Sequence, residues 1–396
     1  MKSGDQKNTK KASVDRTTFR KKIMAHRMQV FGGVAAVVIA VVVIIIVCRV
    51  SFLNQVYTGY EVISTVPRQY VETSTIVSFG NGFLTYSADG IHCTDAKGND
   101  VWSFPYEMQT PMVEVNGNYA AVADYNGRSI YVFNATGEIG TIQTAGPVRE
   151  IEISATGVVL SVEDGGDVTP VHLYYYDGRE IASYRTTMSK SGYPLALGIS
   201  DNGKLVGVSY LYLDNGVLTS KVAFYNFGEV GQNETDNLVS GYDYQGALVP
   251  VVEFLSDSTA FAVANDRIVF FRGGERPTGV ADILLHEEVQ SVFYGEEKVG
   301  LVYLNSAGDT KYKMEIYDAS GRLETTLYFD IEYEDIFFYG DMIVIYNASS
   351  AMIFADNGNL KYQGDFEEAV LLMIPAGSGQ RYILVMKDEI QTIILR

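Results

Sequence analysis

Hydrophobic and polar positions follow two different patterns along the chain. Residues Val30 to Cys48 form nineteen consecutive uncharged positions that are rich in Val, Ile and Ala. Beyond Tyr60, short apolar runs of strand length alternate with turns rich in Gly, Asn and Asp, and no convincing helical periodicity follows. The pattern predicts one apolar helix followed by a large all-β domain.

The apolar segment has the length that a membrane span requires. At about 1.5 Å per residue it covers roughly the 30 Å of a bilayer's hydrocarbon, where a lone segment must satisfy its own backbone hydrogen bonds as a helix. We predict a transmembrane helix at residues 30–50, in which the segment from Val30 to Cys48 is the membrane anchor. A tail at residues 1–29 precedes the helix, and a linker at residues 51–59 follows it. An uncleaved anchor is favoured over a signal peptide because no small-residue cleavage site follows it.

Charge predicts the orientation of this anchor. Residues 1–29 hold nine Lys or Arg and two Asp, a net charge of +7, whereas the remainder holds 21 basic and 46 acidic residues, a net charge of −25. Because a basic flank stays in the cytoplasm, we expect a single-pass protein of the cell membrane with an extracytoplasmic C-terminal domain. The acidity of that domain argues against nucleic acid as a partner.

A recurring turn divides the chain beyond Tyr60 into similar units. An apolar strand runs into a turn that starts with Asp or Asn and ends with Gly, and a second strand follows. Clear copies are Asp95–Gly98, Asn134–Gly137 and Asp318–Gly321, and looser ones end at Gly178, Gly228, Gly273 and Gly358. Each unit contains two further turns, which gives four antiparallel strands. Four-stranded units at this period predict a β-propeller.

The last unit is one strand short. Its strands are expected at Val370–Ile374, Tyr382–Met386 and Ile390–Leu395. The segment at residues 60–66 precedes the first complete unit and can supply the missing outer strand, which would close a ring from residue 60 to residue 396. This arrangement favours eight blades, with seven as the alternative.

One unit carries a family resemblance. The run from Ile91 to Phe104, with Asp95, Gly98 and Trp102, resembles the repeat of quinoprotein-type (PQQ-like) propellers, although Trp102 is the only Trp in the chain. The resemblance implies a propeller fold. That superfamily includes quinone-dependent dehydrogenases and non-catalytic envelope-assembly propellers, and the membrane-anchored form is similar to uncharacterised propeller proteins of Gram-positive bacteria. The resemblance supplies no functional motif.

Candidate chemistry is sparse. The four histidines, His26, His92, His172 and His286, lack the spacing of a zinc site, and no nucleophile elbow accompanies them. Acidic pairs such as Glu163-Asp164 are interpreted as solvated turns. With one Trp and few Arg, the chain is not expected to hold a quinone, so neither a catalytic residue nor a metal or other cofactor is predicted.

The second turn of the unit is longer in three places, around residues 164–169, 214–220 and 306–311. These turns share one face of a propeller with the connections between blades, where such scaffolds bind their ligands. The candidate binding residues are Asp164, Asp167, Asp214, Asn215 and Asp309. The leading hypothesis is a non-catalytic binding or scaffolding module that recruits an envelope protein or a wall-associated ligand. The alternatives are an extracytoplasmic enzyme acting on glycans or redox substrates, and a ligand sensor. The sequence does not indicate an oligomeric state.

Overall fold

The computed structural model describes residues 16–53, 55–69, 72–166, 168–186, 192–295, 297–306, 308–377 and 380–396. The chain divides into two units, Met1–Gln55 and Val56–Arg396, and each is described by itself. The first unit contains helix α1 (Arg16–Leu53), which extends beyond the predicted apolar span on both sides. Its segment Arg20–Ile45, 26 residues long, is long and apolar enough to cross a membrane.

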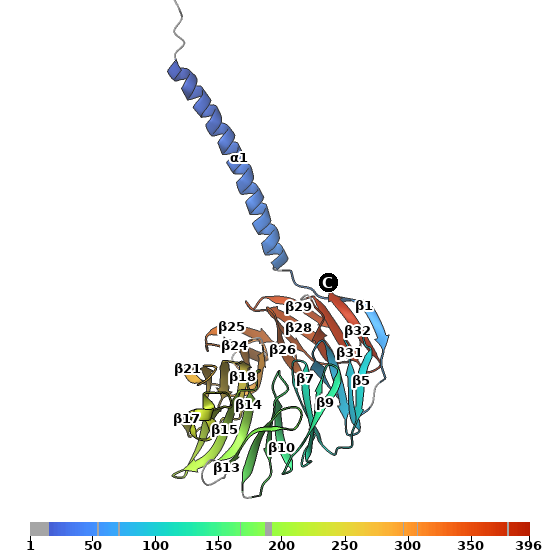
Figure 1. Cartoon of the computed structure of the whole chain (residues 1–396). Helices are drawn as coiled ribbons and strands as arrows, with labels where there is room; N and C mark the ends of the chain where they lie inside the picture. Colours follow the sequence, from blue (N-terminus) through green and yellow to red (C-terminus); the bar gives the residue numbers. More distant parts are fainter. Residues whose placement is uncertain are drawn as a thin grey trace, which may run out of the picture. The chain divides into compact units, whose positions relative to one another are not determined.

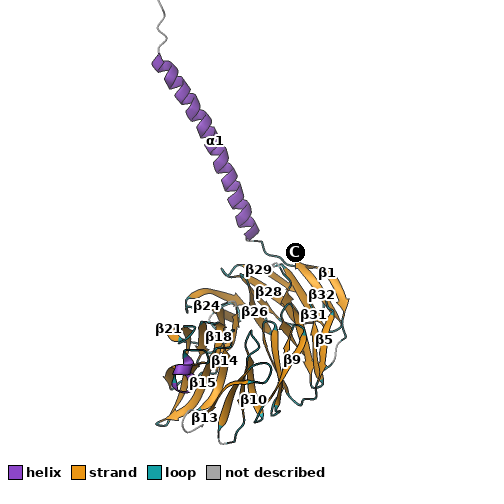
Figure 2. Ribbon diagram, in the orientation of Figure 1, coloured by secondary structure: helices purple, strands orange, loops and turns teal. Residues whose placement is uncertain are grey.

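The second unit is a ring of eight four-stranded antiparallel sheets, the blades. Figures 1 and 2 show how the sheets follow one another around the ring. The predicted all-β propeller with eight blades is therefore confirmed. Blades 1 to 4 are β2 (Thr75–Phe79), β3 (Gly82–Ser87), β4 (Gly90–Thr94), β5 (Asp100–Pro105); β6 (Pro111–Asn116), β7 (Tyr119–Asp124), β8 (Ser129–Asn134), β9 (Gly137–Gln143); β10 (Val148–Ile153), β11 (Val159–Glu163), β12 (Thr169–Tyr174), β13 (Glu180–Thr186); and β14 (Tyr193–Ile199), β15 (Leu205–Asp214), β16 (Val217–Asn226), β17 (Leu238–Gln245).

Two short 3-10 turns, η1 (Gly231–Asn233) and η2 (Thr235–Asn237), precede β17. Blades 5 to 8 are β18 (Val251–Ser256), β19 (Thr259–Val263), β20 (Arg267–Arg272), β21 (Thr278–Leu284); β22 (Val289–Gly295), β23 (Lys298–Leu304), β24 (Tyr312–Asp318), β25 (Leu323–Phe329); β26 (Asp335–Tyr339), β27 (Met342–Tyr346), β28 (Ser350–Ala355), β29 (Leu360–Asp365); and β30 (Val370–Pro375), β31 (Arg381–Met386), β32 (Glu389–Leu395) with β1 (Tyr60–Pro67).

The strands of a blade differ in burial according to their place in it. The first strand lies innermost, beside the first strand of a neighbouring blade, as β14 lies beside β18 and β22 beside β26. The second strand is covered on both faces, and all five residues of β19 are buried. The fourth strand alternates between exposed and half-buried positions, as in β5. The second strands therefore read as continuous apolar runs, because both of their faces are packed.

The hydrophobic core is distributed among the interfaces between blades. Within the described residues, eight clusters of buried side chains are present, one at each of the eight interfaces. A single twisted four-stranded sheet cannot cover both of its own faces, so each blade depends on its two neighbours. The cluster between blades 8 and 1 is the smallest, with six buried residues that include Phe83 and Ile390.

Strand β1, the closing strand, completes blade 8. It pairs antiparallel with β32 from Tyr60 opposite Leu395 to Pro67 opposite Glu389, with one irregularity between Val62 and Ser64. Just before it, Tyr57 forms an isolated bridge to Tyr362 of blade 7. The two ends of the ring are thus joined within one sheet.

The alternating strand directions give the ring two faces. The first and third turns of every blade lie on one face, and the closing strand starts there, because Tyr60 pairs with the end of β32. We call this the entry face; the C-terminus lies beside β1 on it (Figure 1). The second turns and the connections between blades lie on the opposite face, the second-turn face.

Candidate functional site

The first predicted loop, between β11 and β12, contains Asp164. This carboxylate forms an ion pair with Arg149, whose guanidinium lies 5.2 Å from the centre of the Tyr125 ring. The hydrogen bond from Arg149 holds the pKa of Asp164 below its ordinary value. Asp167 lies outside the described residues. Asp164 is therefore held by Arg149 of its own blade, and Arg149 in turn packs on Tyr125 of the preceding blade.

Glu163, the neighbour of Asp164, is fully buried between blades 2 and 3. Its carboxylate accepts hydrogen bonds from Gly146 N at 2.7 Å, Ser161 Oγ at 3.2 Å and Tyr174 Oη at 3.2 Å. The interpretation of the Glu163-Asp164 pair as a solvated turn is wrong for Glu163, because Glu163 is the last residue of β11, a second strand that is buried along its whole length, and its carboxylate is bound by these donors. Its surroundings indicate a structural role.

The second predicted loop is the tip of a long hairpin. Strands β15 and β16 are ten residues each and extend to Asp214 and Val217, so the turn consists of Asn215 and Gly216 alone. Both turn residues have positive φ, 49° and 83°, as a tight two-residue hairpin requires. The expected long loop at residues 214–220 is thus mostly strand, and Asp214 and Asn215 are exposed at its tip.

This hairpin rises above the strands that flank it. Pairing of β14 with β15 ends at Leu211, and pairing of β17 with β16 ends at Thr219. In the described part of the chain, residues 213–218 therefore form a two-stranded ribbon tip without a third strand. Three large apolar side chains are exposed on it: Leu213 at 71%, Leu218 at 42% and Val217 at 40%. The sequence reasoning named the polar tip residues and missed these apolar ones, although their position beside an Asn-Gly turn was a usable signal.

The third predicted loop lies in blade 6 and contains the exposed Asp309. Asn305 donates to Thr310 Oγ1 at 2.9 Å and Lys311 N donates to Asp330 at 2.7 Å, which fixes both ends of the loop. All three loops are second turns and therefore lie on the second-turn face. Blades 3 and 4 are neighbours, so Asp164 and the ribbon tip belong to adjacent blades, whereas Asp309 is two blades further on.

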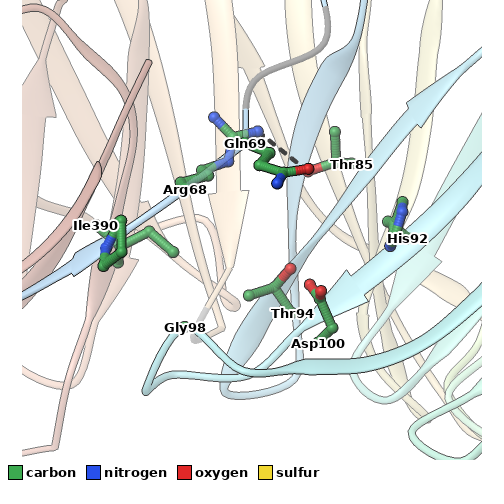
Figure 3. A pocket seen from close by; sticks show the side chains of 9 residues that line it. Arg68, Gln69, Thr85, His92, Thr94, Gly98, Asp100 and Ile390 are labelled. Carbon is green, nitrogen blue, oxygen red and sulfur yellow. Dashed lines mark hydrogen bonds between the residues drawn. The ribbon is translucent and has the colours of Figure 1, made fainter. Parts of the chain in front are cut away.

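A cavity of about 360 Å³ lies between blades 8 and 1. Arg68 and Gln69, just after the closing strand, form one wall, and Thr94 and Asp100 of blade 1 lie across from them (Figure 3). Arg68 donates to Met386 O at 2.9 Å and to Thr85 Oγ1 at 3.3 Å, so its guanidinium bridges the two blades. The mixed lining suits a small polar molecule more than an apolar one.

Four glutamates from three blades interact at the centre of the ring. They are Glu114 on β6, Glu150 and Glu152 on β10, and Glu253 on β18, and all four are half-buried. Burial, together with the charge of the other acids for Glu150 and Glu253, raises the pKa of Glu114 and Glu150 to about 7 and that of Glu253 to about 8. The Tyr294 hydroxyl donates to Glu253. Sequence reasoning missed this cluster.

The described residues contain no group of three or more His, Cys, Asp or Glu side chains placed to hold a metal ion. His92 lines the cavity between blades 8 and 1, and His172 lies 3.9 Å from Glu163 and 3.3 Å from Glu180. His92 and His172 thus lie in different blades, each with its own surroundings.

These features define an eight-bladed β-propeller that follows an N-terminal apolar helix. The chain belongs to a family of unknown function, DUF5711, whose model matches residues 53–395. No curated protein matches it. Among solved structures, BamB from Moraxella catarrhalis is similar, with 11% identity over 85% of this chain and 100% of that chain and a TM-score of 0.51. A eukaryotic initiation factor has 14% identity over 83% of this chain and 84% of its own, with a TM-score of 0.51. At these identities the likeness shows the fold alone.

Proposed function

We propose that this protein is a propeller tethered to the outer surface of the cytoplasmic membrane, where it acts as a non-catalytic binding or scaffolding module for an envelope protein or wall-associated ligand. Residues 1–29 are its cytoplasmic tail, and the helix that follows is its anchor. In keeping with the resemblance to membrane-anchored propellers of Gram-positive bacteria, we assign it to a bacterial envelope.

The observation that carries this proposal is the position of the apolar helix in the chain. Helix α1 ends at Leu53, and Tyr57 is already paired with Tyr362 of the ring. Opposite net charges flank the apolar span, +7 before it and −25 after it, which favours retention of the tail in the cytoplasm. The chain segment between the helix and the strand that completes the ring is short, which supports the proposal that the helix tethers the ring to the membrane.

The distribution of features over the two faces supports binding on the second-turn face. The chain enters the ring on the opposite face, at Tyr57 and Tyr60. The ribbon tip and the loops with Asp164 and Asp309 lie on the second-turn face, where exposed Leu213 and Leu218 offer apolar contact. Exposed apolar groups that project from a rigid scaffold are typical of protein-binding surfaces.

Labelling of single cysteines in intact cells tests the topology. In a chain with Cys48→Ala and Cys93→Ala, one variant carries Asn215→Cys on the ring and another carries Lys10→Cys in the tail. We expect a membrane-impermeant maleimide to label the Asn215→Cys variant in intact cells and the Lys10→Cys variant only after lysis. The reverse pattern would overturn the proposed location.

Photo-crosslinking tests the binding role in the same cells. A benzophenone amino acid is placed at Asn215 on the second-turn face, and a matched variant carries it at Asn357, in a third turn on the entry face. We expect an adduct from position 215 that position 357 does not give. Absence of an adduct together with turnover of a glycan or quinone by the purified full-length chain would replace the scaffold by an enzyme.

A further inference from the structure

A small irregularity marks equivalent residues in blades 1 to 7. In each of these blades the pairing of the third strand with the fourth shifts its register once, and the third-strand residue after the shift has the same place in every blade. In blades 2 to 7 it is a buried aromatic residue that packs against the preceding blade: Phe133, Tyr174, Tyr225, Phe271, Tyr317 and Phe354. In blade 1 it is Thr94.

The aromatic side chain of blade 1 lies one strand further in. Thr94 is paired with Phe83 of β3, whereas in blades 2 to 7 the second-strand residue at this place is an Ala, Val or Ile. Phe83 is buried in the cluster between blades 8 and 1. Only the short Thr94 side chain is left on the third strand, and it lines the cavity of about 360 Å³ between these blades. The cavity therefore lies where the other blades hold an aromatic ring.

Blade 3 shows what surrounds an aromatic ring at this place. His172, two residues before Tyr174 on β12, stacks on Tyr174 with the two ring centres 5.5 Å apart. Its Nδ1 atom lies 3.3 Å from Glu180 Oε2, and Glu180 is paired with Tyr174 across β12 and β13. A histidine and a carboxylate thus flank the Tyr174 ring.

Blade 1 has the same histidine and carboxylate without the aromatic ring. His92 lies two residues before Thr94 on β4, and Asp100 is paired with Thr94 across β4 and β5. All three residues line the cavity. His92 and Asp100 are also exposed, so a ligand can reach the cavity from solvent. The arrangement of blade 3 would be complete in blade 1 if a tyrosine side chain entered from outside.

The wall opposite Thr94 is polar. It is formed by Arg68 and Gln69, in the connection from the closing strand to blade 1, and Arg68 donates to Thr85 Oγ1 at 3.3 Å. The cavity is the space that remains with Arg68 in this position, and Figure 3 shows Thr94 and Asp100 pointing into it. The Gln69 amide and the Thr85 hydroxyl can both bond a hydroxyl group. A ring with a hydroxyl at its end therefore suits the cavity.

We propose that this cavity, the seam pocket, binds the phenol of a tyrosine side chain of a partner protein. The phenol stacks on His92 as Tyr174 stacks on His172, and its hydroxyl meets Gln69 and Thr85 on the opposite wall. Because the pocket lies between blades 8 and 1, the bound phenol also joins the two blades between which the propeller closes. This inference rests on the proposed function and names the chemistry of the partner.

Charge and shape favour a phenol over other occupants. A free anion would meet Asp100 and a free cation would meet Arg68, so a neutral group is preferred. A phenylalanine would leave the polar wall without a partner. A saccharide has no aromatic face to stack on His92. A second copy of the chain would bring a domain of net charge −25 against another of the same charge. A tyrosine of a different protein meets none of these objections.

Saturation-transfer NMR tests the seam pocket on the full-length chain in nanodiscs of zwitterionic lipid, with empty nanodiscs as the reference. The probe is N-acetyl-tyrosinamide, and N-acetyl-phenylalaninamide and N-acetyl-leucinamide are the comparison compounds. We expect the tyrosine probe to bind best. Its Kd should rise about tenfold or more in Thr94→Phe, where the chain's own ring fills the pocket as in blades 2 to 7. It should also rise in His92→Ala, which removes the stacking surface but only changes an exposed side chain.

A second blocking variant is Phe83→Ala/Thr94→Phe. It gives blade 1 the pair that blade 2 has in Ala120 and Phe133, so it fills the pocket without placing two aromatic side chains opposite each other. We expect it to bind the tyrosine probe as weakly as Thr94→Phe does. An unchanged melting temperature of each variant excludes loss of fold as the cause.

Matched controls change the same residue types at exposed positions outside the seam pocket. They are Thr136→Phe in the third turn of blade 2 and His286→Ala after blade 5. Both should bind the tyrosine probe like the parent. Parent-like binding by both blocking variants, or equal binding of the three compounds, would overturn the seam pocket.

Two further measurements distinguish other occupants. A dimer in mass photometry that Thr94→Phe abolishes would assign the pocket to a second copy. Stronger saturation transfer to N-acetylglucosamine than to the tyrosine probe, lost in Thr94→Phe, would assign it to a saccharide. Either result overturns the inference. An adduct from position 215 in cells, together with no binding of the tyrosine probe by the parent, would leave the proposed scaffold intact and remove the seam pocket.

Discussion

Gly321 lies directly against Ala281 of the preceding blade: a Cβ atom added to Gly321 would be 2.5 Å from the Ala281 Cβ atom. The same relationship recurs around the ring. A Cβ on Gly98 would be 3.0 Å from Val66 of the closing strand, and one on Gly358 would be 3.0 Å from Thr325. The repeated glycine thus supplies a positive φ, 80° at Gly321, and also the close approach of successive blades.

A pair of glycine substitutions separates these two contributions. Gly216 has nearly the same φ as Gly321, 83° against 80°, but an added Cβ there meets no described atom within 4 Å. We expect Gly216→Ala to lower the free energy of unfolding by about 1 kcal/mol through backbone strain. Gly321→Ala should lose about 2 kcal/mol more, because its Cβ must displace Ala281. Urea unfolding followed by fluorescence measures both, and equal losses would refute the packing role.

The buried carboxylate of Glu163 gives a second prediction. Glu163→Ala leaves Gly146 N and the Tyr174 hydroxyl buried without their acceptor, so we expect a loss of about 3 kcal/mol in the free energy of unfolding. Glu180→Ala removes a side chain that is 47% exposed and lies beside His172, and should cost less than about 1 kcal/mol. Equal effects of the two substitutions in urea unfolding would contradict a structural role for Glu163.

The regular parts of the ring were predictable because their causes are local. Asp95 accepts hydrogen bonds from Lys97 N at 2.8 Å and Asn99 N at 2.9 Å, so its turn is formed by residues within the turn itself. Gly98 completes that turn with a φ of 80°. Because each blade repeats this local chemistry, counting turns is sufficient to count blades, and the result was eight.

The candidate site was less predictable because it depends on contacts across the ring. Glu114 and Glu253 lie in different blades, and each sits on an ordinary alternating strand, so the sequence contains no sign that their charges interact. The exposure of Leu213 likewise depends on where β14 and β17 stop, which is set by their pairing and not by the sequence of the hairpin. Polarity identified the turn residues Asp214 and Asn215 as candidates, whereas the apolar residues beside them were not recognised as exposed.

Closure of the ring by β1 gives a third prediction. Thr65 lies opposite Gln391 in the pairing of β1 with β32, a geometry that a disulfide can bridge. Thr65→Cys/Gln391→Cys should form a bridge on oxidation and raise the free energy of unfolding by up to about 5 kcal/mol, because it closes a loop that spans almost the whole ring. Comparison of the oxidised and reduced forms of the same variant is the control. A bridge that forms without changing stability would show that this pairing does not limit unfolding.

The four glutamates at the centre of the ring make stability depend on pH. Their pKa values in the folded ring are raised above the ordinary 4.5, to about 7 for Glu114 and Glu150 and about 8 for Glu253, with burial as the main cause. Between pH 4.5 and about pH 8 the folded ring therefore binds more protons than the unfolded chain. Their contribution to stability is therefore complete below pH 4.5 and is lost as the pH rises through 7 to 8.

We accordingly expect the melting temperature of the full-length chain to fall between pH 5.5 and pH 8.5. Glu253→Gln removes one titrating group while keeping its shape, so it should raise the melting temperature at pH 8.5 and flatten the profile. Glu332→Gln is the matched control, because Glu332 lies on the surface beside Lys311 and its pKa is lowered. A profile that Glu253→Gln leaves as steep as that of the parent would show that the central glutamates do not control it. A profile flattened by both variants would point to general surface charge instead.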